Sequence, residues 1–402
     1  MAIRTKSIIT FIRGLLYVAL ISSALNVSVM LGLDRGYEAT ASLEIGWPNI
    51  IFKTSILLIC ALAFLMSWLS LGLDRRMWPF IAFFIWGCLV WFCTGTTLIG
   101  IRQLASFLTS ILFLLAASRV FDVSKDLGIL KKCLFGAVIL LIGAGILQNL
   151  LGHGPAVGTM VDKWDVHSLH TGAGSVLQQT VIPITSGLIF ISSFIYTRKK
   201  LSGLVGTLLI ILGSLVLLRG VILGLCVGLA SLFLVGKLNR VRYTIILFLI
   251  IGLLTIIIGP YVYRKSFTKS GYIETHGRMK QWPVLLEYAL EKPLLGHGPN
   301  SDLEYFNYIR AREFGVAHNE YLGLFVSFGV PGLLLYIAGI VCLFWRTIKL
   351  KPLNSNSIIG RNCSIAVLSL LMVAAMFGNL FRQPGVMIAL FVFPAACIGS
   401  RK

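Results

Sequence analysis

The stretch VAHNEYLGLFVSFGVPGLLLY, from Val316 to Tyr336, starts with polar residues and continues as an apolar run long enough for a membrane-spanning helix. Its polar residues are His318, Asn319 and Glu320, which would lie in the first turn of that helix. Such groups can cap the free N–H groups at a helix start. The stretch therefore predicts a helix that enters a membrane with a polar cluster at its entrance.

The whole chain has the composition of a polytopic membrane protein. Its 402 residues are 57% hydrophobic and only 12% charged. A soluble domain cannot bury that much apolar surface, so we expect a single all-α integral membrane domain over residues 1–402. Hydropathy predicts about twelve membrane-spanning helices of about 20 residues each. Their predicted ranges are 14–33, 49–73, 77–95, 98–118, 133–151, 173–196, 202–218, 220–236, 243–260, 319–345, 362–380 and 384–400.

The net charge of +20 is distributed unevenly among the predicted loops. With twelve spans, clusters such as Arg75–Arg76, Arg198–Lys200 and Arg401–Lys402 all fall on one side, together with both termini. The positive-inside rule makes that side the cytoplasm. Because these basic residues occupy short loops between spans, we do not expect nucleic-acid binding.

The opposite side is predicted to carry the polar chemistry. Its longest loop spans about residues 261–317, and an amphipathic helix is expected over Trp282–Leu290, before Gly296, Gly298 and Pro299. A structured loop of this length is more often functional than not. Every histidine falls on this side: His153, His167, His170, His276, His297 and His318.

Several basic residues are predicted at span ends on this outer side, against the positive-inside rule. For Lys53 we favour a contact with lipid headgroups, and for Arg382 we expect the same. For Arg219 we favour function, because it occupies a tight reversal where a planar, permanent charge could bind phosphate. For Arg102 both interpretations stay open, a contact with lipid headgroups and a functional role.

The sequence does not predict a metal centre or a cofactor. None of the eight cysteines lies in the two long outer loops, which disfavours a disulfide framework and a zinc site. The outer loops also lack an Asp-x-Asp pair, and Asp162 and Asp165 are spaced too widely to share a cation. The turn sequence LLGHGP occurs twice, at 150–155 and 294–299, but its flanks differ, so we interpret it as shared turn chemistry.

Three motifs occur in order along the chain: Arg219–Gly220, then Gly277–Arg278 with Trp282, then PLLGHGPNS followed by AHNEYL. This order resembles the O-antigen ligase and polymerase superfamily of bacterial envelope proteins. The resemblance covers residues 205–340 well, whereas the N-terminal half matches only in hydropathy and span number. One local departure is that Ser214 lies five positions before Arg219, where the family commonly has Ser or Thr closer.

The resemblance implies a metal-independent, inverting glycosyltransferase with a GT-C-like helical fold in the bacterial inner membrane. Such proteins take a glycan from undecaprenyl pyrophosphate on the periplasmic face. The essential arginines of the family correspond to Arg219 and Arg278, and its essential histidine to His318. Asn319 and Glu320 are interpreted as orienting and capping groups. The substrate-binding candidates are Arg102, Trp282, Asn319 and Glu320.

The residue chemistry agrees with this implication. Two arginines can offset the charge of a departing pyrophosphate, and a histidine can accept the proton of an attacking hydroxyl. The acceptor would be lipid A core for a ligase, or another lipid-linked repeat unit for a polymerase. We favour a ligase because one outer loop dominates, and polymerase stays open. A transporter of lipid-linked or anionic substrates would instead favour ionisable groups near mid-bilayer and internal repeats, which the pattern lacks.

Overall fold

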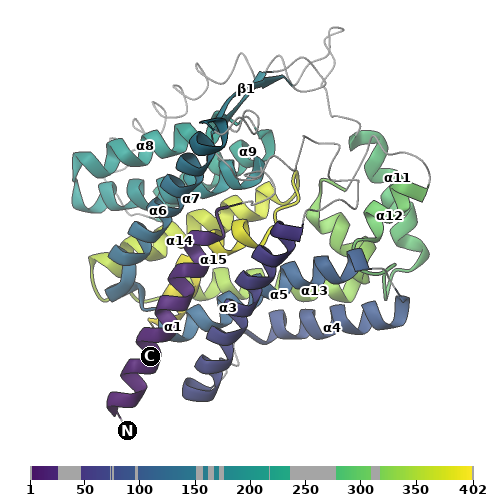
Figure 1. Ribbon diagram of the computed structural model, residues 1–402, viewed down its shortest axis with the longest axis horizontal. Helices are drawn as coiled ribbons and strands as arrows, with labels where there is room; N and C mark the ends of the chain where they lie inside the picture. Colours follow the sequence, from purple (N-terminus) through teal and green to yellow (C-terminus); the bar gives the residue numbers. More distant parts are fainter. Residues whose placement is uncertain are drawn as a thin grey trace.

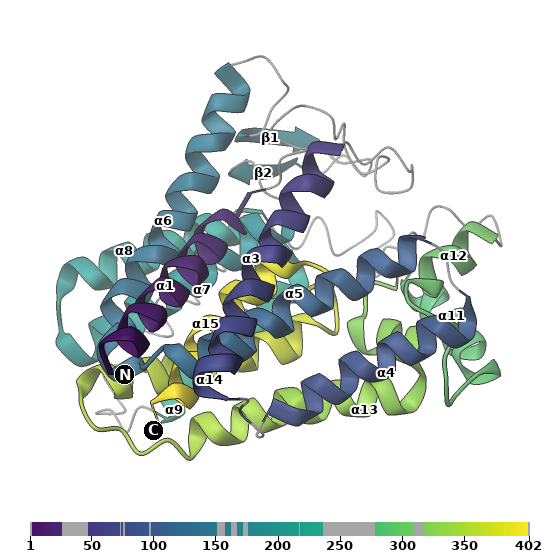
Figure 2. The same cartoon turned by 60° about the horizontal axis from the view of Figure 1, so that its bottom comes forward.

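A computed structural model of the chain describes residues 2–25, 47–72, 74, 77–95, 98–150, 157–161, 167–171, 176–216, 218–235, 278–308 and 317–400. These residues form helices and one small hairpin (Figures 1 and 2). The elements are α1 (Ala2–Ser22), α3 (Trp47–Leu71), α4 (Trp78–Thr94), α5 (Leu98–Val120), α6 (Val123–Leu150), β1 (Val157–Val161), β2 (His167–Thr171), α7 (Val176–Thr197), α8 (Lys200–Ser214), α9 (Arg219–Val235), α11 (Arg278–Glu291), α12 (Ser301–Tyr308), α13 (Glu320–Ile348), α14 (Ser355–Ala374) and α15 (Pro384–Gly399).

The prediction of a polytopic helical membrane protein is confirmed. In the described residues, 6 helices are long and apolar enough to cross a membrane, namely α3, α5, α6, α7, α13 and α14. Shorter apolar helices include α4, α8 and α15. The predicted span 243–260 lies outside the described residues. The first helix begins earlier than predicted, at Ala2, because Arg4 and Lys6 lower local hydropathy without ending the helix.

The predicted outer loop at residues 152–172 contains an element that hydropathy does not show. β1 and β2 pair antiparallel, with Val157 opposite Thr171 and Val161 opposite His167. The two strands have only 5 residues each, so their period-two alternation is too short to stand out beside the long apolar helices.

Helix α15 lies at the centre of the molecule. Its sequence PGVMIALFVFPAACIG is apolar on every side, and its residues from Gly385 to Gly399 are buried. A helix that is hydrophobic all round must be covered all round. Contacts with α5, α6, α7, α13 and α14 provide that cover (Figure 1).

Helix α9 packs closely on α14 through small residues. A Cβ atom at Gly224 would lie 2.7 Å from the Leu370 carbonyl oxygen, and one at Gly228 would lie 2.8 Å from that of Ala366. This spacing of four is how membrane helices bring their backbones together. One turn earlier, a Cβ at Gly220 would collide with Phe377, in the connection between α14 and α15. The beginning of α9 is therefore fixed against that connection.

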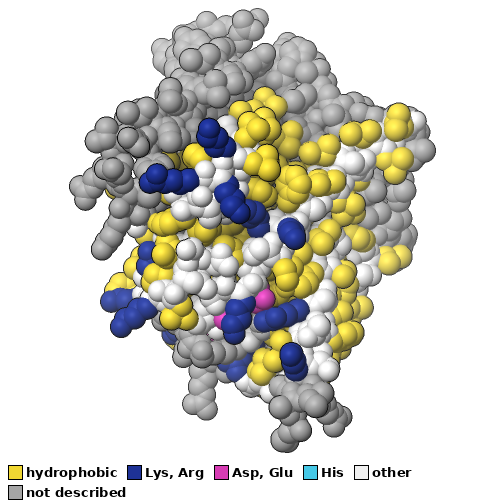
Figure 3. Space-filling view, turned by 90° about the vertical axis from the view of Figure 1, so that its left-hand side faces the viewer, with side chains coloured by type: hydrophobic (Ala, Val, Ile, Leu, Met, Phe, Trp, Pro, Cys, Tyr) yellow, Lys and Arg dark blue, Asp and Glu magenta, His cyan; other side chains and the backbone are white. Residues whose placement is uncertain are grey.

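Helices α11 and α12 lie at one end of the molecule, away from the two termini (Figures 1 and 2). Helix α11 packs on α13 through buried Leu285 and Ala289, while Leu286 and Leu290 are exposed. The expected amphipathic helix at Trp282–Leu290 is thus present within α11. On the face opposite α11 and α12, Lys and Arg side chains gather and acidic side chains are sparse (Figure 3).

Candidate active site

Ala317 is the first described residue after α12 and directly precedes His318. Both backbone polar groups of Ala317 are bound. Its carbonyl accepts a hydrogen bond of 3.1 Å from Trp282 Nε1 on α11, and its N–H donates one of 3.1 Å to Asp302 Oδ2 on α12. Ala317 is fully buried. The backbone that presents His318 is therefore held from two different helices.

His318 itself has a left-handed backbone conformation, with φ of 47°, and its side chain is half-buried. A non-glycine residue pays about 1–2 kcal/mol for this conformation, so the surroundings must hold it there. The next residue, Asn319, caps α13, since its Oδ1 accepts a hydrogen bond of 3.1 Å from the Leu322 N–H. The capping group expected from the sequence is present, and it orients the helix immediately after His318.

Glu320 anchors this entrance to the connection between α14 and α15. Its side chain is 1% exposed, and its Oε1 accepts a hydrogen bond of 2.9 Å from the Phe381 N–H. Its own N–H donates to the Ala375 carbonyl at 2.9 Å. Phe381 in turn packs on Tyr336 with ring centroids 4.5 Å apart. Glu320 therefore serves as an internal anchor, with almost no surface left for a substrate.

Arg382 completes the cluster, and the expectation that it contacts lipid headgroups is wrong. Its side chain is 12% exposed, and its guanidinium forms two hydrogen bonds with Asp302, of 2.7 and 3.0 Å. It also donates to Asn300 Oδ1 at 2.9 Å and lies 3.8 Å from Glu320 Oε2. Burial acts to lower the pKa of Arg382, but the carboxylates of Asp302 and Glu320 outweigh it and raise that pKa above its usual value.

Asp302, Asn300 and Arg382 are the part of the site that the sequence interpretation missed. Asp302 and Arg382 are 80 positions apart, and hydropathy treats each as an ordinary loop charge. The available signal was their opposite charge on the same predicted side. Arg382 forms a bidentate pair with a buried carboxylate, so its charge is balanced inside the protein and needs no lipid headgroup.

The two arginines predicted to be essential occupy the first positions of two helices, α9 and α11. Arg219 begins α9, whose next residue, Gly220, lies against Phe377 in the connection that also carries Arg382. Arg278 begins α11, and Trp282, one turn later, binds Ala317. Helix starts add partial positive charge, which favours an anion such as a pyrophosphate.

Comparison with known families finds a match over part of the chain. Residues 202–337 match the family model described as O-antigen ligase. Residues 202–337 are thus similar to an O-antigen ligase domain, and this matched region is given that name below. The resemblance to the O-antigen ligase and polymerase superfamily is therefore confirmed. No curated protein matches the chain.

The O-antigen ligase domain contains most of α8, all of α9, α11 and α12, and residues 320–337 of α13. Arg219, Arg278, Asp302 and His318 lie inside it, while Arg382 comes from the connection beyond it. The Arg382–Asp302 pair therefore joins the domain to the C-terminal helices. The domain alone would leave the Asp302 carboxylate, which is fully buried, without its cation.

Within the domain, helix α13 is interrupted at its FGVPG sequence, residues 328–332. Gly329 has φ of 66°, and Pro331 lacks an N–H, so carbonyls before the break lose their helical donors. The turn after α11 replaces those donors: His297 N–H binds the Val326 carbonyl at 2.8 Å, and Gly298 N–H binds that of Ser327 at 3.1 Å. The second LLGHGP segment, at 294–299, thus fixes the turn after α11 to the break in α13.

The other predicted residues take up different positions. Arg102 is exposed near the start of α5, which lies at the same end of the molecule as α11 and α12 (Figure 2). His297 contacts the Tyr288 carbonyl at 2.6 Å and so has a structural role in the O-antigen ligase domain. His153 and His276 lie outside the described residues, as do Asp162 and Asp165.

Among described residues, no group of three or more His, Cys, Asp or Glu could hold a metal ion.

Proposed function

We propose that this protein is a membrane glycosyltransferase of the O-antigen ligase type. It would transfer a glycan from undecaprenyl pyrophosphate to a sugar hydroxyl of lipid A core, at the periplasmic face of the bacterial inner membrane. The observation that carries the proposal is the fixed backbone before His318, within a region that matches the O-antigen ligase family model. The basic face opposite α11 supports cytoplasmic termini and a periplasmic site (Figure 3).

In the proposed reaction, His318 accepts the proton of the acceptor hydroxyl as its oxygen attacks C1 of the first donor sugar. The bond between C1 and the pyrophosphate oxygen breaks, and undecaprenyl pyrophosphate leaves. Arg219 and Arg278 would offset the negative charge that develops on that oxygen. Attack opposite the leaving group inverts the configuration at C1, and the two arginines supply the positive charge without a metal ion.

The roles of the remaining residues follow from their contacts. Trp282, Asn319 and Glu320 would position His318 through the backbone. The Arg382–Asp302 pair would hold α12 to the connection between α14 and α15. Arg102 would contact a substrate phosphate at the same outer end. The proposal includes a GT-C-like arrangement, with a helical membrane core and an outer loop that covers the site.

A gene deletion tests the proposed function. Loss of all polysaccharide on lipid A core, with polymer accumulating on the lipid carrier, is the result expected for a ligase. Core that carries a single repeat unit would instead identify a polymerase, the alternative that the same family contains. In complementation, Arg219→Ala, Arg278→Ala and His318→Ala should each abolish transfer while the protein stays in the membrane. An unchanged glycan profile after deletion would overturn both assignments.

A further inference from the structure

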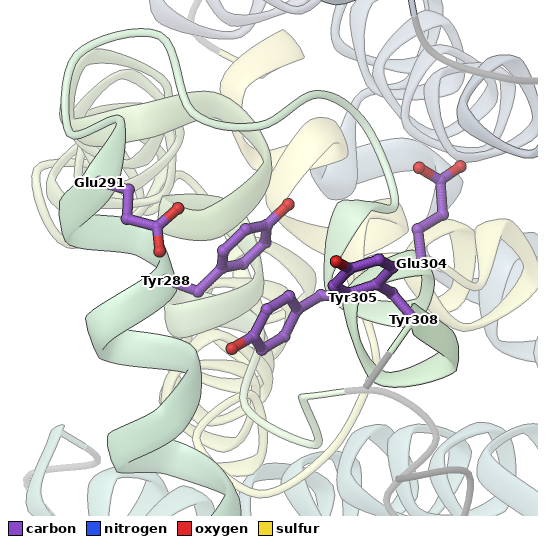
Figure 4. A pocket seen from close by; sticks show the side chains of 5 residues that line it. All are labelled: Tyr288, Glu291, Glu304, Tyr305 and Tyr308. Atoms are coloured by element: carbon purple, nitrogen blue, oxygen red, sulfur yellow. The ribbon is translucent and has the colours of Figure 1, made fainter. Parts of the chain in front are cut away.

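A hollow of about 360 Å³ lies between α11 and α12, separate from the residues that hold His318 (Figure 4). Tyr288 and Glu291 of α11 line one side, and Glu304, Tyr305 and Tyr308 of α12 line the other. Its volume falls within the range of small-molecule pockets, about 300–1,000 Å³. The space is therefore large enough for a sugar unit, and the proposed mechanism does not use it.

The aromatic side of this pocket is preformed. The rings of Tyr288 and Tyr305 stack with centroids 4.0 Å apart and planes 12° apart. The His297 ring stacks on Tyr288 at 3.6 Å, and its Nε2 is tied to the Tyr288 carbonyl at 2.6 Å. Rings that are already held in place lose little entropy when a ligand arrives. Tyr308 is 84% exposed and forms the open edge.

The charge of the pocket selects among ligands. Its two charged lining residues, Glu291 and Glu304, are both acidic. Burial raises the pKa of Tyr288, and the two carboxylates raise it further, so its hydroxyl stays protonated and can donate. Carboxylates repel phosphate groups but accept hydrogen bonds from hydroxyls. The lipid pyrophosphate is thus unsuited to this pocket, whereas a hydroxyl-rich ligand is suited.

We propose that Tyr288, Tyr305 and Tyr308, with Glu291 and Glu304, form a binding subsite for a hydroxyl-rich sugar ring of the glycan substrates. One C–H face of a sugar ring can lie against a tyrosine ring, and its hydroxyls can reach the carboxylates. The inference rests on the proposed function, which it deepens by adding a place for the glycan away from its reacting end. Both the donor glycan and the acceptor core offer such rings.

The subsite belongs to the same packed unit as His318. Tyr288 and Tyr305 pack against a small hydrophobic cluster that contains Leu285, Phe306 and Ala317. Ala317 directly precedes His318 and is bound to Trp282 of α11. A sugar held between α11 and α12 is therefore held by the two helices that also fix the backbone of His318.

The test measures sugar binding independently of transfer. Purified full-length protein in lipid nanodiscs is mixed with two probes, the delipidated core oligosaccharide and the repeat-unit oligosaccharide of the native cells. Binding is followed by saturation-transfer NMR on the sugar ring protons. The variants are Tyr308→Ala and Glu291→Gln, both at exposed positions. The matched control is Leu290→Ala, an exposed side chain of α11 that does not line the pocket.

We expect each pocket variant to weaken binding of at least one probe by about fivefold or more, with Leu290→Ala unchanged. The probe affected identifies whether the donor or the acceptor glycan occupies the subsite. The assay measures sugar binding without transfer, so a failure of the proposed transfer chemistry leaves this result intact. Equal binding by wild type, Tyr308→Ala and Glu291→Gln would overturn the subsite, as would binding of a cationic probe such as spermidine with no sugar binding.

Discussion

The Asp302 carboxylate and the Arg382 guanidinium meet in two hydrogen bonds, 2.7 and 3.0 Å long, and the same carboxylate holds the N–H of Ala317. One ion pair thus connects α12, the entrance of α13 and the connection between α14 and α15. His318 follows Ala317 directly. The position of the proposed base therefore depends on a cation that lies outside the O-antigen ligase domain.

Replacing Arg382 should destabilise the protein and impair transfer together. Arg382→Ala leaves the buried Asp302 carboxylate unpaired, which typically costs about 3–5 kcal/mol. Arg382→Lys keeps the charge but cannot form the bidentate pair with the Asp302 carboxylate. We therefore expect a smaller loss of stability and a clear loss of activity. Thermal unfolding in detergent and transfer assays measure the two effects.

The matched control for Arg382 is Arg198→Ala, which removes an exposed basic residue between α7 and α8. It should leave the unfolding temperature and activity close to those of the wild type, because exposed charges contribute little. Wild-type stability and activity in Arg382→Ala would show that the ion pair does not hold the site.

Trp282→Phe should slow transfer while the protein stays folded. The change keeps the aromatic ring but removes the Nε1–H that binds the Ala317 carbonyl, a bond worth about 1 kcal/mol of stability. Because that bond orients the backbone before His318, we expect the loss in kcat, with KM for the donor nearly unchanged. Trp345→Phe, at an exposed position on α13, is the control and should behave as wild type. A raised KM with unchanged kcat would instead assign Trp282 to substrate binding.

Gly329→Ala should be strongly destabilising, because it adds a Cβ where the α13 break meets the turn after α11. At φ of 66°, the new methyl group would collide with the carbonyl of Leu294. We expect a cost of more than about 1–2 kcal/mol, seen as a lower unfolding temperature. Gly143→Ala on α6, where nothing lies within 4 Å of the new Cβ, should be neutral or slightly stabilising. Equal unfolding temperatures for the two variants would contradict the described packing of the break.

Stability should fall at acidic pH through His297. Burial lowers the pKa of His297 below its ordinary value of 6.5, although the Tyr288 carbonyl opposes this shift. The unfolded chain then binds a proton more readily than the folded one, so this contribution is fully present above about pH 6.5 and declines as pH falls below it. Unfolding temperatures of wild type and His297→Gln at about pH 7.5 and about pH 5.5 measure the effect. The decline should be smaller in His297→Gln, and equal declines would exclude His297 as its source.

Local features of the site were predictable from the sequence because they depend on neighbouring residues. Asn319 caps the helix that follows it, and Gly329 and Pro331 interrupt the helix that contains them. The long apolar runs likewise became helices, and the amphipathic pattern after Trp282 became α11. In each case the physical cause acts within one or two turns of the chain.

The long-range features were not predictable in this way. Nothing near Arg382 in the sequence indicates that Asp302 neutralises it, so the general tendency of basic residues to contact headgroups gave the wrong expectation. The stacking of His297 on Tyr288 and of Tyr288 on Tyr305 also depends on how α11 and α12 pack. Such contacts follow from tertiary structure, which a single sequence does not encode in any local pattern.

The most direct test of the central claim is glycan transfer by the purified protein in nanodiscs, with undecaprenyl pyrophosphate-linked glycan as donor and lipid A core as acceptor. His318→Ala should lower the rate by about 10²–10⁴-fold, as loss of a general base does, while its unfolding temperature stays near that of the wild type. Transfer by His318→Ala at the wild-type rate would contradict the account.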